Sequence, residues 1–344
     1  MWSLTVCSGW LLAALSLCML AGFFSNDRQL QNKQMKNLRR CAVAPIMLVL
    51  AGVVRAQDQT PLIPAGKTLE IAEHIYVIPD QRVNLVPNIG VIVGRDGVLV
   101  IDTGMGPKNA ETVLGEVKKI TSERIAYLTV THFHPEHGMG AQAFPPGTTI
   151  IYSMAQKTEL MAKGTDYINV FKGFSPEIAE LLKPVRIIMP NVTFAEEAEV
   201  NLGDVSARLL HWGPAHTLGD EFVFLPEKRV LFGGDVVVNR FFPIMPDGDA
   251  SGRNWIKVLE RMEKLNPAIV VPGHGEVGDA VLIAKMREYL EFVRDRVEQM
   301  KSQGSTLADV EKRLEPEIRA KYKDWGNPNW IKNAIDNFYN TNAK

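Results

Sequence analysis

Thr131-His-Phe-His-Pro-Glu-His-Gly-Met-Gly140 is the stretch that decides how this chain folds, because it gathers three of the seven histidines within six residues. The run that precedes it, Ile125–Thr131, is apolar and β-branched and predicts a buried strand. In an extended chain His132 and His134 point to the same side, and the proline that follows turns the chain. Imidazole and carboxylate groups are ligands that suit zinc and similar divalent metals. The stretch therefore predicts a metal site at the end of a strand.

The composition is that of an ordinary globular protein. The chain has 344 residues, 46% of them hydrophobic, which suffices for one large domain or two modest ones. With 38 basic and 39 acidic residues the net charge is −1, so the composition indicates no nucleic-acid partner and no strongly basic membrane-surface protein. We find no internal repeat and expect a small-molecule substrate.

The first 56 residues resemble a targeting leader, so they predict export and are left out of the fold prediction. Residues 2–24 are almost entirely apolar and long enough to span a bilayer. A basic segment at 35–40, an apolar run at 41–54 and a small-x-small site ending at Ala56 then make a second, complete signal peptide. We expect translation to start at Met35 and cleavage before Gln57, which gives a periplasmic or secreted protein with no membrane segment. The alternative is a retained membrane anchor at residues 2–24.

All three cysteines, Cys7, Cys18 and Cys41, lie in this leader. A chain that starts at Gln57 would have none, which suits an oxidising compartment because no wrong disulfide can form. Its stability must then come from a hydrophobic core and from bound metals.

An alternation of strands and helices predicts an α/β domain. We expect one strand over Leu69–Ile78, with His74 as a surface or strand histidine, and a hairpin from Asn88–Val93 and Val98–Ile101. The second hairpin strand ends at Asp102, ahead of a helix up to Ile120. Asp102 is either a group that orients a metal ligand or a turn or N-cap acid.

Three later strands also end in ligand-type residues beside glycines. His216 precedes the strand 221–225, Asp235 follows the strand 229–232, and His274 follows the strand 268–271. Each residue alone is weak evidence, but delivery of several such groups by strand ends indicates one site.

Two further segments are less clear. A helix is expected over Met154–Ala162, and then a connection over 164–183 in which Tyr167, Phe171 and Phe174 form either a pocket wall or part of the core. From residue 280 onward, helical periods predict packing helices that could also form the surface of a homo-oligomer.

Together these motifs resemble the metallo-β-lactamase superfamily of hydrolases. The resemblance spans about residues 88–275 and is carried by Asn88-Ile-Gly, Asp102-Thr-Gly, the His132–His137 cluster, Ala215-His-Thr, Gly233-Gly-Asp and Pro272-Gly-His-Gly. It implies an αββα sandwich of two mixed sheets flanked by helices, with a helical C-terminal extension. The expected division is a leader over 1–56, the metallo-β-lactamase-like domain over 57–279 and the extension over 280–344.

The resemblance also implies the ligands of two divalent metal ions, expected to be Zn²⁺, with iron as the alternative. The first ion would take His132, His134 and His216, the second would take His137 and His274, and Asp235 would bridge them. Glu136 stands where the family usually has aspartate. It either reaches the second metal, acts as a base through water, or leaves that metal weakly bound.

The implied chemistry is attack of a metal-bridging hydroxide on an ester, lactone, thioester or amide carbonyl, β-lactams included, with Glu136 and Asp235 as catalytic groups. Asp235 in place of cysteine puts the chain nearer the glyoxalase II, lactonase and sulfatase-like branches. We expect Asn239, Arg240 and Phe241 to contact the substrate, with Arg240 clamping a carboxylate. The alternatives are an iron-dependent sulfur oxygenase on the same fold and a periplasmic metal-binding accessory protein.

Overall fold

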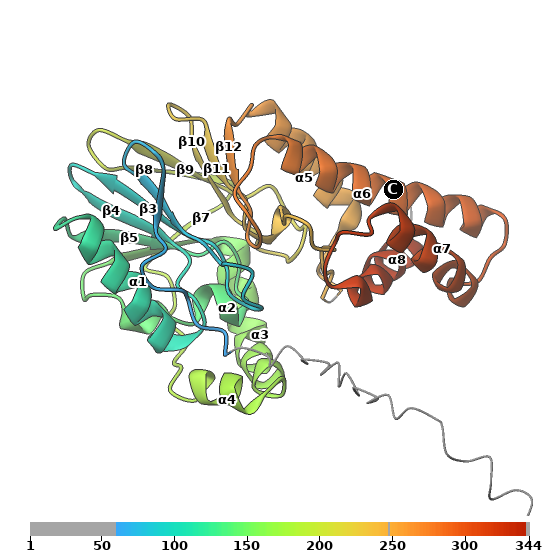
Figure 1. The fold of residues 1–344 in the computed structure, drawn as a ribbon, viewed down its shortest axis with the longest axis horizontal. Helices are drawn as coiled ribbons and strands as arrows, with labels where there is room; N and C mark the ends of the chain where they lie inside the picture. Colours follow the sequence, from blue (N-terminus) through green and yellow to red (C-terminus); the bar gives the residue numbers. More distant parts are fainter. Residues whose placement is uncertain (1–59, 247, 342–344) are drawn as a thin grey trace, which may run out of the picture. The chain divides into compact units, whose positions relative to one another are not determined.

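Two β-sheets stack face to face between helices, as Figure 1 shows for residues 60–246 and 248–341, which the computed structural model describes. This arrangement confirms the predicted αββα sandwich of mixed sheets with a helical C-terminal extension. The predicted leader lies outside the described residues. Within the described part of the chain, no helix has the length and apolar character needed to cross a bilayer.

The first sheet has seven strands that neighbour one another in chain order. Strands β1 to β4 pair antiparallel, and β4 to β7 pair parallel. The strands are β1 (Leu69–Ala72), β2 (Ile75–Ile78), β3 (Ile89–Gly94), β4 (Gly97–Ile101), β5 (Ile125–Thr129), β6 (Thr149–Ser153) and β7 (Val192–Phe194).

The second sheet has five strands in the order β12-β11-β10-β9-β8. Only β11 and β12 are parallel, and the remaining pairs are antiparallel. The strands are β8 (Glu197–Asn201), β9 (Ser206–Leu210), β10 (Phe222–Leu225), β11 (Val230–Phe232) and β12 (Ile269–Val271).

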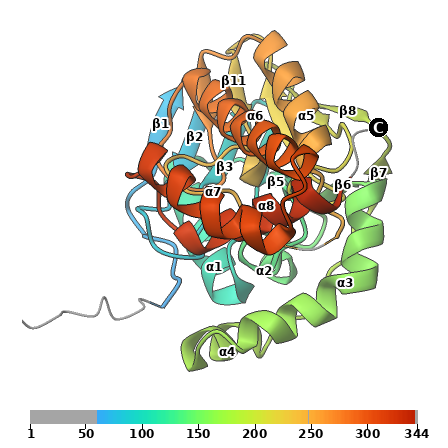
Figure 2. The ribbon, with the colours of Figure 1, turned by 90° about the vertical axis from the view of Figure 1, so that its right-hand side faces the viewer.

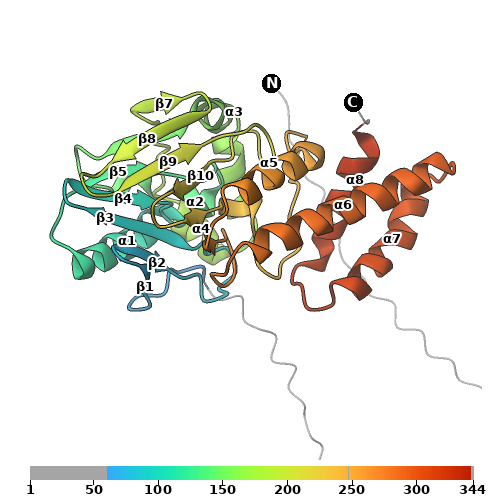
Figure 3. The ribbon, with the colours of Figure 1, turned by 90° about the horizontal axis from the view of Figure 1, so that it is seen from above.

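Helices cover the outer face of each sheet. Figures 2 and 3 show α1, α3 and α4 on the side of the first sheet, and α5 to α8 on the side of the second. The helices are α1 (Gly106–Ile120), α2 (Pro135–Gly138), α3 (Met154–Lys172), α4 (Pro176–Leu182), α5 (Gly252–Lys264), α6 (Val281–Ser302), α7 (Leu307–Lys321) and α8 (Ile331–Asn340). Short 3₁₀ turns η1 (Ala141–Ala143), η2 (Gly234–Val236) and η3 (Pro328–Trp330) complete the set.

The central strands are apolar on both faces because both faces are covered. In β4, Val98 and Val100 belong to the core beneath α1, whereas Leu99 and Ile101 belong to the core between the sheets. A strand buried on both sides reads as a continuous apolar run rather than an alternating one. A third core joins the outer face of the second sheet to α5 through α8, so the C-terminal helices pack on that sheet.

Two local predictions need correction, and one helix was missed. The single strand predicted over 69–78 is a hairpin, because His74 has a left-handed φ of 63° and turns the chain between β1 and β2. Helix α3 does not end at Ala162 but continues to Lys172 through Gly164, which packs closely against Leu160 and Ile187. Helix α5 was not predicted, although Ser251 caps it and an amphipathic face buries Trp255.

The fold brings the carboxyl ends of several strands to one edge. Asp102 follows β4, the histidine-rich stretch follows β5, Asp235 lies just after β11, and His274 lies just after β12. Because β4 and β5 are parallel, as are β11 and β12, each pair ends at the same edge of its sheet.

Candidate metal centre

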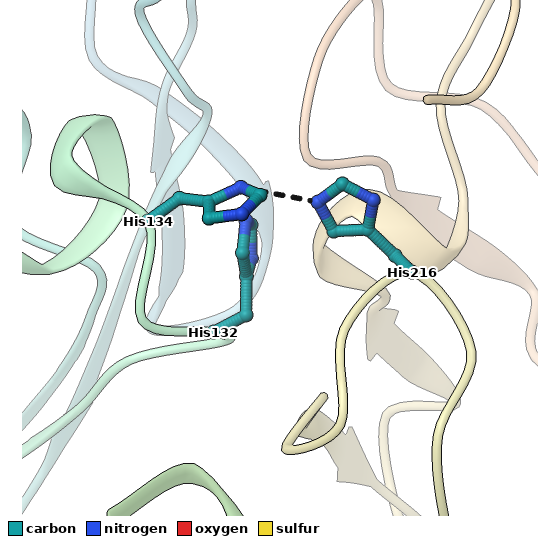
Figure 4. Close-up of side chains that lie close together, drawn as sticks. All are labelled: His132, His134 and His216. Carbon is teal, nitrogen blue, oxygen red and sulfur yellow. Dashed lines mark hydrogen bonds between the residues drawn. The ribbon is translucent and has the colours of Figure 1, made fainter. Parts of the chain in front are cut away.

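Three histidines from two loops form the first group of candidate ligands. His132 and His134 follow β5, and His216 lies in the loop between β9 and β10. Their ligand nitrogens lie within 4.8 Å of one another, and all three side chains are buried. Figure 4 shows His216 facing the other two from the opposite side. Two parts of the chain about eighty residues apart therefore meet at one point.

Glu136, His137 and His274 form a second group with the same spread of 4.8 Å. Asp235 lies between the groups. Its Oδ1 is 3.5 Å from His137 Nε2 and 3.6 Å from His274 Nε2. Its Oδ2 is 3.8 Å from His216 Nε2. One carboxylate oxygen thus faces each group, which is the arrangement a bridging ligand requires.

The donor atoms fit divalent metal ions. Two nitrogens bound tetrahedrally at about 2.0–2.1 Å from zinc lie about 3.3 Å apart, and His134 Nδ1 lies 3.2 Å from His216 Nε2. Several buried donor atoms also have no hydrogen-bond partner among the described residues, a state that costs free energy unless something binds them. They are His132 Nε2, Glu136 Oε2, His137 Nε2 and Asp235 Oδ1.

Hydrogen bonds behind the cluster orient three of the rings. The Nδ1 atoms of His216 and His274 lie 2.9 Å from the carbonyl oxygens of Ile244 and Val86. A carbonyl only accepts, so Nδ1 carries the hydrogen and Nε2 is turned toward the site. Partners of this kind fix the ring and raise its basicity as a ligand.

Asp102 plays the same part for His137. Its Oδ2 accepts from His137 Nδ1 at 2.9 Å, and its two oxygens also accept from the Thr131 backbone N–H and hydroxyl at 2.7 and 3.0 Å. The left-handed φ of 67° at Asp102 turns this buried carboxylate back toward the cluster. Of the two interpretations left open by the sequence, this geometry favours the orienting role. Asp102 does not cap α1, whose N-cap residue is Met105.

Asp80 and Asn88 hold the loop that carries His274. The Asn88 amide donates to the carbonyls of Pro272 and Gly275, and Asp80 accepts from the Gly275 backbone N–H at 2.8 Å. Asp80 was missed in the sequence because its partner lies 195 residues away. Its only local signal is an acid at the end of an apolar strand.

Glycines allow the loops to approach the carboxylate. A Cβ on Gly273 would stand 2.0 Å from Asp235 Oδ1, and Gly234 has a left-handed φ of 52°. A side chain at 273 would therefore displace the Asp235 carboxylate.

Burial and neighbouring charges set the protonation of the cluster. Burial, helped by the neighbouring histidines, lowers the pKa of His132 and His134 well below 6.5, so these rings stay neutral. Burial raises the pKa of Glu136 to about 7, and Asp235 adds to the rise. For His137 burial acts in the opposite direction, but Asp102 and Asp235 outweigh it and raise its pKa to about 9. Metal binding at His137 would release a proton.

Beneath the cluster, Glu221 links the two sheets. Its carboxyl group accepts from the Ser153 backbone N–H and lies 3.0 Å from the hydroxyl of Thr129. That hydroxyl lies 2.8 Å from the Ile151 carbonyl and has only one hydrogen to donate. A protonated Glu221 carboxyl would let both contacts be hydrogen bonds, since it would donate to the Thr129 hydroxyl while that hydroxyl donates to Ile151. Burial raises the pKa of Glu221 well above its usual value, in agreement with this geometry.

The cluster lies at the head of a cavity of about 820 Å³ with mainly apolar walls. Tyr167 and Phe171 of α3 line it, and Tyr167 stacks on His134 with ring centroids 4.9 Å apart. These aromatics are thus a pocket wall on a helix, not part of a loop. Phe171 is also buried in the core beneath α3, so the two interpretations of these residues are not exclusive.

Of the three residues expected to contact substrate, only Phe241 lines this cavity. Asn239 donates to the Glu276 carbonyl, and Arg240 is exposed and borders a different hollow. Arg240 has a left-handed φ of 62°, and it does not line the site. Among the described lining residues the basic side chain is instead Arg82, which pairs with Glu276 and lies 5.1 Å from the Phe241 ring.

Comparison with known proteins agrees with the fold. The sequence profile of the metallo-beta-lactamase superfamily matches residues 83–274. A linear primary-alkylsulfatase of a Pseudomonas species is 24% identical over 262 residues, which are 66% of this chain and 48% of that protein. A type 2 metallo-beta-lactamase of Bacillus cereus is 24% identical over 210 residues, 60% of this chain and 74% of that protein. The chain thus spans about half the length of the alkylsulfatase it matches.

Solved structures show the same fold at low sequence identity. The sec-alkylsulfatase Pisa1 of a Pseudomonas species superposes with a TM-score of 0.64 at 15% identity, over 79% of this chain and 49% of that protein. A metallo-beta-lactamase of Pontibacter korlensis superposes with a TM-score of 0.52 at 21% identity, over 65% of this chain and 98% of that protein.

Proposed function

This chain belongs to the metallo-beta-lactamase superfamily, and we propose that it is an exported metal-dependent hydrolase of neutral esters, lactones, thioesters or amides. The observation that carries this proposal is the set of buried donor atoms without partners at the head of an apolar cavity. Such convergence of polar groups at one end of a mainly apolar pocket is typical of a small-molecule site.

The residues that would hold two divalent metals, expected to be Zn²⁺, are the two groups described above, with Asp235 between them. When bound, such ions supply Lewis-acid chemistry that polarises a carbonyl group and lowers the pKa of water. Glu136 lines the cavity and has one carboxylate oxygen without a partner among the described residues. It is the group placed to accept a proton from the attacking water and to return it to the leaving group.

Apart from the metal ions, the side-chain charges of the cavity favour a neutral substrate. Arg82 is the one basic side chain other than histidine among its described lining residues, and Glu276 neutralises it. A sulfate ester, as the similarity to alkylsulfatases would suggest, or the carboxylate of a β-lactam would find no free side-chain cation there. A neutral carbonyl compound needs none.

A metal-replete substrate panel tests the proposal. The purified protein, depleted of metal and reloaded with Zn²⁺, Mn²⁺ or Fe²⁺, is assayed against neutral esters, lactones, thioesters and amides, with alkyl sulfates and β-lactams as separate arms. We expect hydrolysis of a neutral class that is lost in His134→Ala. A matched control is His74→Asn, because His74 is exposed and asparagine tolerates its left-handed backbone.

Other outcomes would point elsewhere. Faster turnover of alkyl sulfates than of every carbonyl substrate would overturn the proposed substrate class. One iron per chain with oxygen uptake would indicate the sulfur oxygenase. Tight metal binding without turnover of any panel member would indicate an accessory protein. N-terminal sequencing of the exported protein checks the predicted start at Gln57.

A further inference from the structure

The cavity at the candidate metal centre has a second hollow beside it. A hollow of about 230 Å³ borders the main chamber. The two share five lining residues, which we call the neck: Asn84, Leu85, Phe174, Asn327 and Trp330. A ligand that starts at the cluster and exceeds the main chamber in length would pass these residues.

The neck is built from three distant parts of the chain. Asn84 and Leu85 belong to the loop after β2, Phe174 follows α3, and Asn327 and Trp330 lie at η3 beside the C-terminal helix α8. The C-terminal helices therefore do more than pack on the second sheet, since they supply part of the cavity wall.

Apolar surface at the neck stays open to solvent. Phe174 is 53% exposed, and Val170, which lines the main chamber one helical turn earlier, is 55% exposed. Large apolar side chains exposed together beside a cavity mark a binding surface. A ligand chain lying against them would remove this surface from water.

The polar groups around the neck are uncharged. The side-chain amides of Asn84, Asn327 and Asn333 make no hydrogen bond to another described residue, and all three line the main chamber. They offer donors and acceptors but no charge, so they suit a neutral ligand with one polar group rather than an ion.

We propose that Trp330 and Phe174 select substrates by the length of an apolar chain, so that the preferred substrate is an elongated neutral acyl or alkyl compound whose chain passes between them. The assignment of the reacting end rests on the proposed hydrolytic function, whereas the chain-binding role does not. Each methylene that packs against the aromatic and aliphatic side chains of the cavity should strengthen binding about fourfold, the equivalent of about 0.8 kcal/mol. The gain should stop once the chain has passed the second hollow.

A binding assay on the metal-free protein tests this without any catalysis. The neutral fluorophore N-phenyl-1-naphthylamine is bound and then displaced by straight-chain primary amides from butanamide to tetradecanamide. We expect affinity to climb with chain length and then level off. In Trp330→Ala the long amides should lose about tenfold in affinity, whereas the short ones should stay within about twofold.

Two further variants keep the result interpretable. Phe174→Ser alters the other side of the neck at a half-exposed position outside any helix, so it gives the same test if Trp330→Ala does not fold. Tyr339→Ala removes an aromatic ring of α8 that does not line the cavity, and it should leave the length series unchanged.

The proposal is overturned if affinity does not depend on chain length. It is also overturned if both neck variants lose the same affinity for short and for long amides. Hydrolysis of esters of increasing chain length distinguishes a failure of the length-selection proposal from a failure of the proposed hydrolytic function. A length series in binding without hydrolysis would refute only the reaction, and hydrolysis without a length preference would refute only the neck.

Discussion

Asp102→Asn should weaken one metal site and spare the other. The asparagine oxygen can still accept from the Thr131 backbone N–H, which bonds Asp102 at 2.7 Å. Its amide nitrogen, however, cannot accept from His137 Nδ1, which lies 2.9 Å from the present carboxylate. An amide donating to Nδ1 would move the ring hydrogen to Nε2, the atom that faces Asp235. The second ligand group then loses a donor although no ligand has been removed.

The expected size of the effect follows from the kind of contact that is lost. Removing an outer partner of a ligating histidine costs about 10- to 100-fold in metal affinity, or about 1.4–2.7 kcal/mol. The first group should be much less affected, because in the described part of the chain Asp102 makes hydrogen bonds to Thr131 and His137 and to none of the three histidines of that group. Asp102→Asn should therefore bind one zinc ion normally and a second one weakly.

Zinc titration against a fluorescent chelator measures both affinities, and ¹⁵N spectra of the imidazole rings report the tautomer of His137. Asp96→Asn is the matched control, since Asp96 is an exposed turn residue far from any candidate ligand in sequence. Two zinc ions bound with wild-type affinity, or an unchanged His137 tautomer, would refute the orienting role of Asp102.

Three other substitutions test neighbouring parts of the argument. Glu136→Gln keeps the shape of the side chain but removes the base. Hydrolysis should therefore fall at least about 100-fold, while zinc binding at the first group persists. Retained turnover would exclude Glu136 as the proton carrier. Gly273→Ala places a methyl group 2.0 Å from Asp235 Oδ1 and should lower zinc content and turnover together, whereas Gly115→Ala, with open space around it, should do neither. Glu221 keeps its proton in the folded state because burial raises its pKa, while the unfolded chain releases it above about pH 4.3. The stability it contributes is therefore complete below that pH and declines as the pH rises toward the folded pKa, by at most about 1.4 kcal/mol per pH unit. In urea unfolding from about pH 5 to about pH 8, Glu221→Gln should flatten this decline, and equal slopes for both proteins would count against a protonated Glu221.

The sequence predicts the parts of this structure whose signals are local. The β-branched run before Thr131 and the Gly/Asp-rich turn between residues 94 and 97 lie within single elements, and both produce the expected strands. The predicted helix ends at Ala162, before Gly164, a residue type that lowers helix propensity. In the fold α3 continues through Gly164, because the missing side chain lets Leu160 and Ile187 approach. Tertiary packing outweighed the local preference there.

The sequence predicts only part of the cavity wall: Phe241, and Tyr167 and Phe171 as one of two interpretations. Arg240 looked suitable beside Asp235 in sequence, yet Arg82 occupies the cavity because its loop is joined to the His274 loop through Glu276. Trp330 likewise reaches the site only because the C-terminal helices fold back onto the second sheet. Sequence position thus indicated most of the candidate metal ligands, which lie near strand ends, but it missed cavity residues such as Arg82 and Trp330, which come from distant parts of the chain.

Glu136 is both a candidate metal ligand and a residue that lines the cavity. It belongs to the histidine-rich stretch, and one of its carboxylate oxygens lies within 4.8 Å of the ligand nitrogens of His137 and His274. It also lines the cavity, which His137, fully buried behind it, does not. Glu136 therefore keeps its carboxylate in the candidate cluster and also faces the cavity. Since Thr103 anchors the surrounding turn through the His137 carbonyl and the Gly140 backbone N–H, a change at 136 alters the chemistry offered to substrate while the turn that carries the other ligands stays in place.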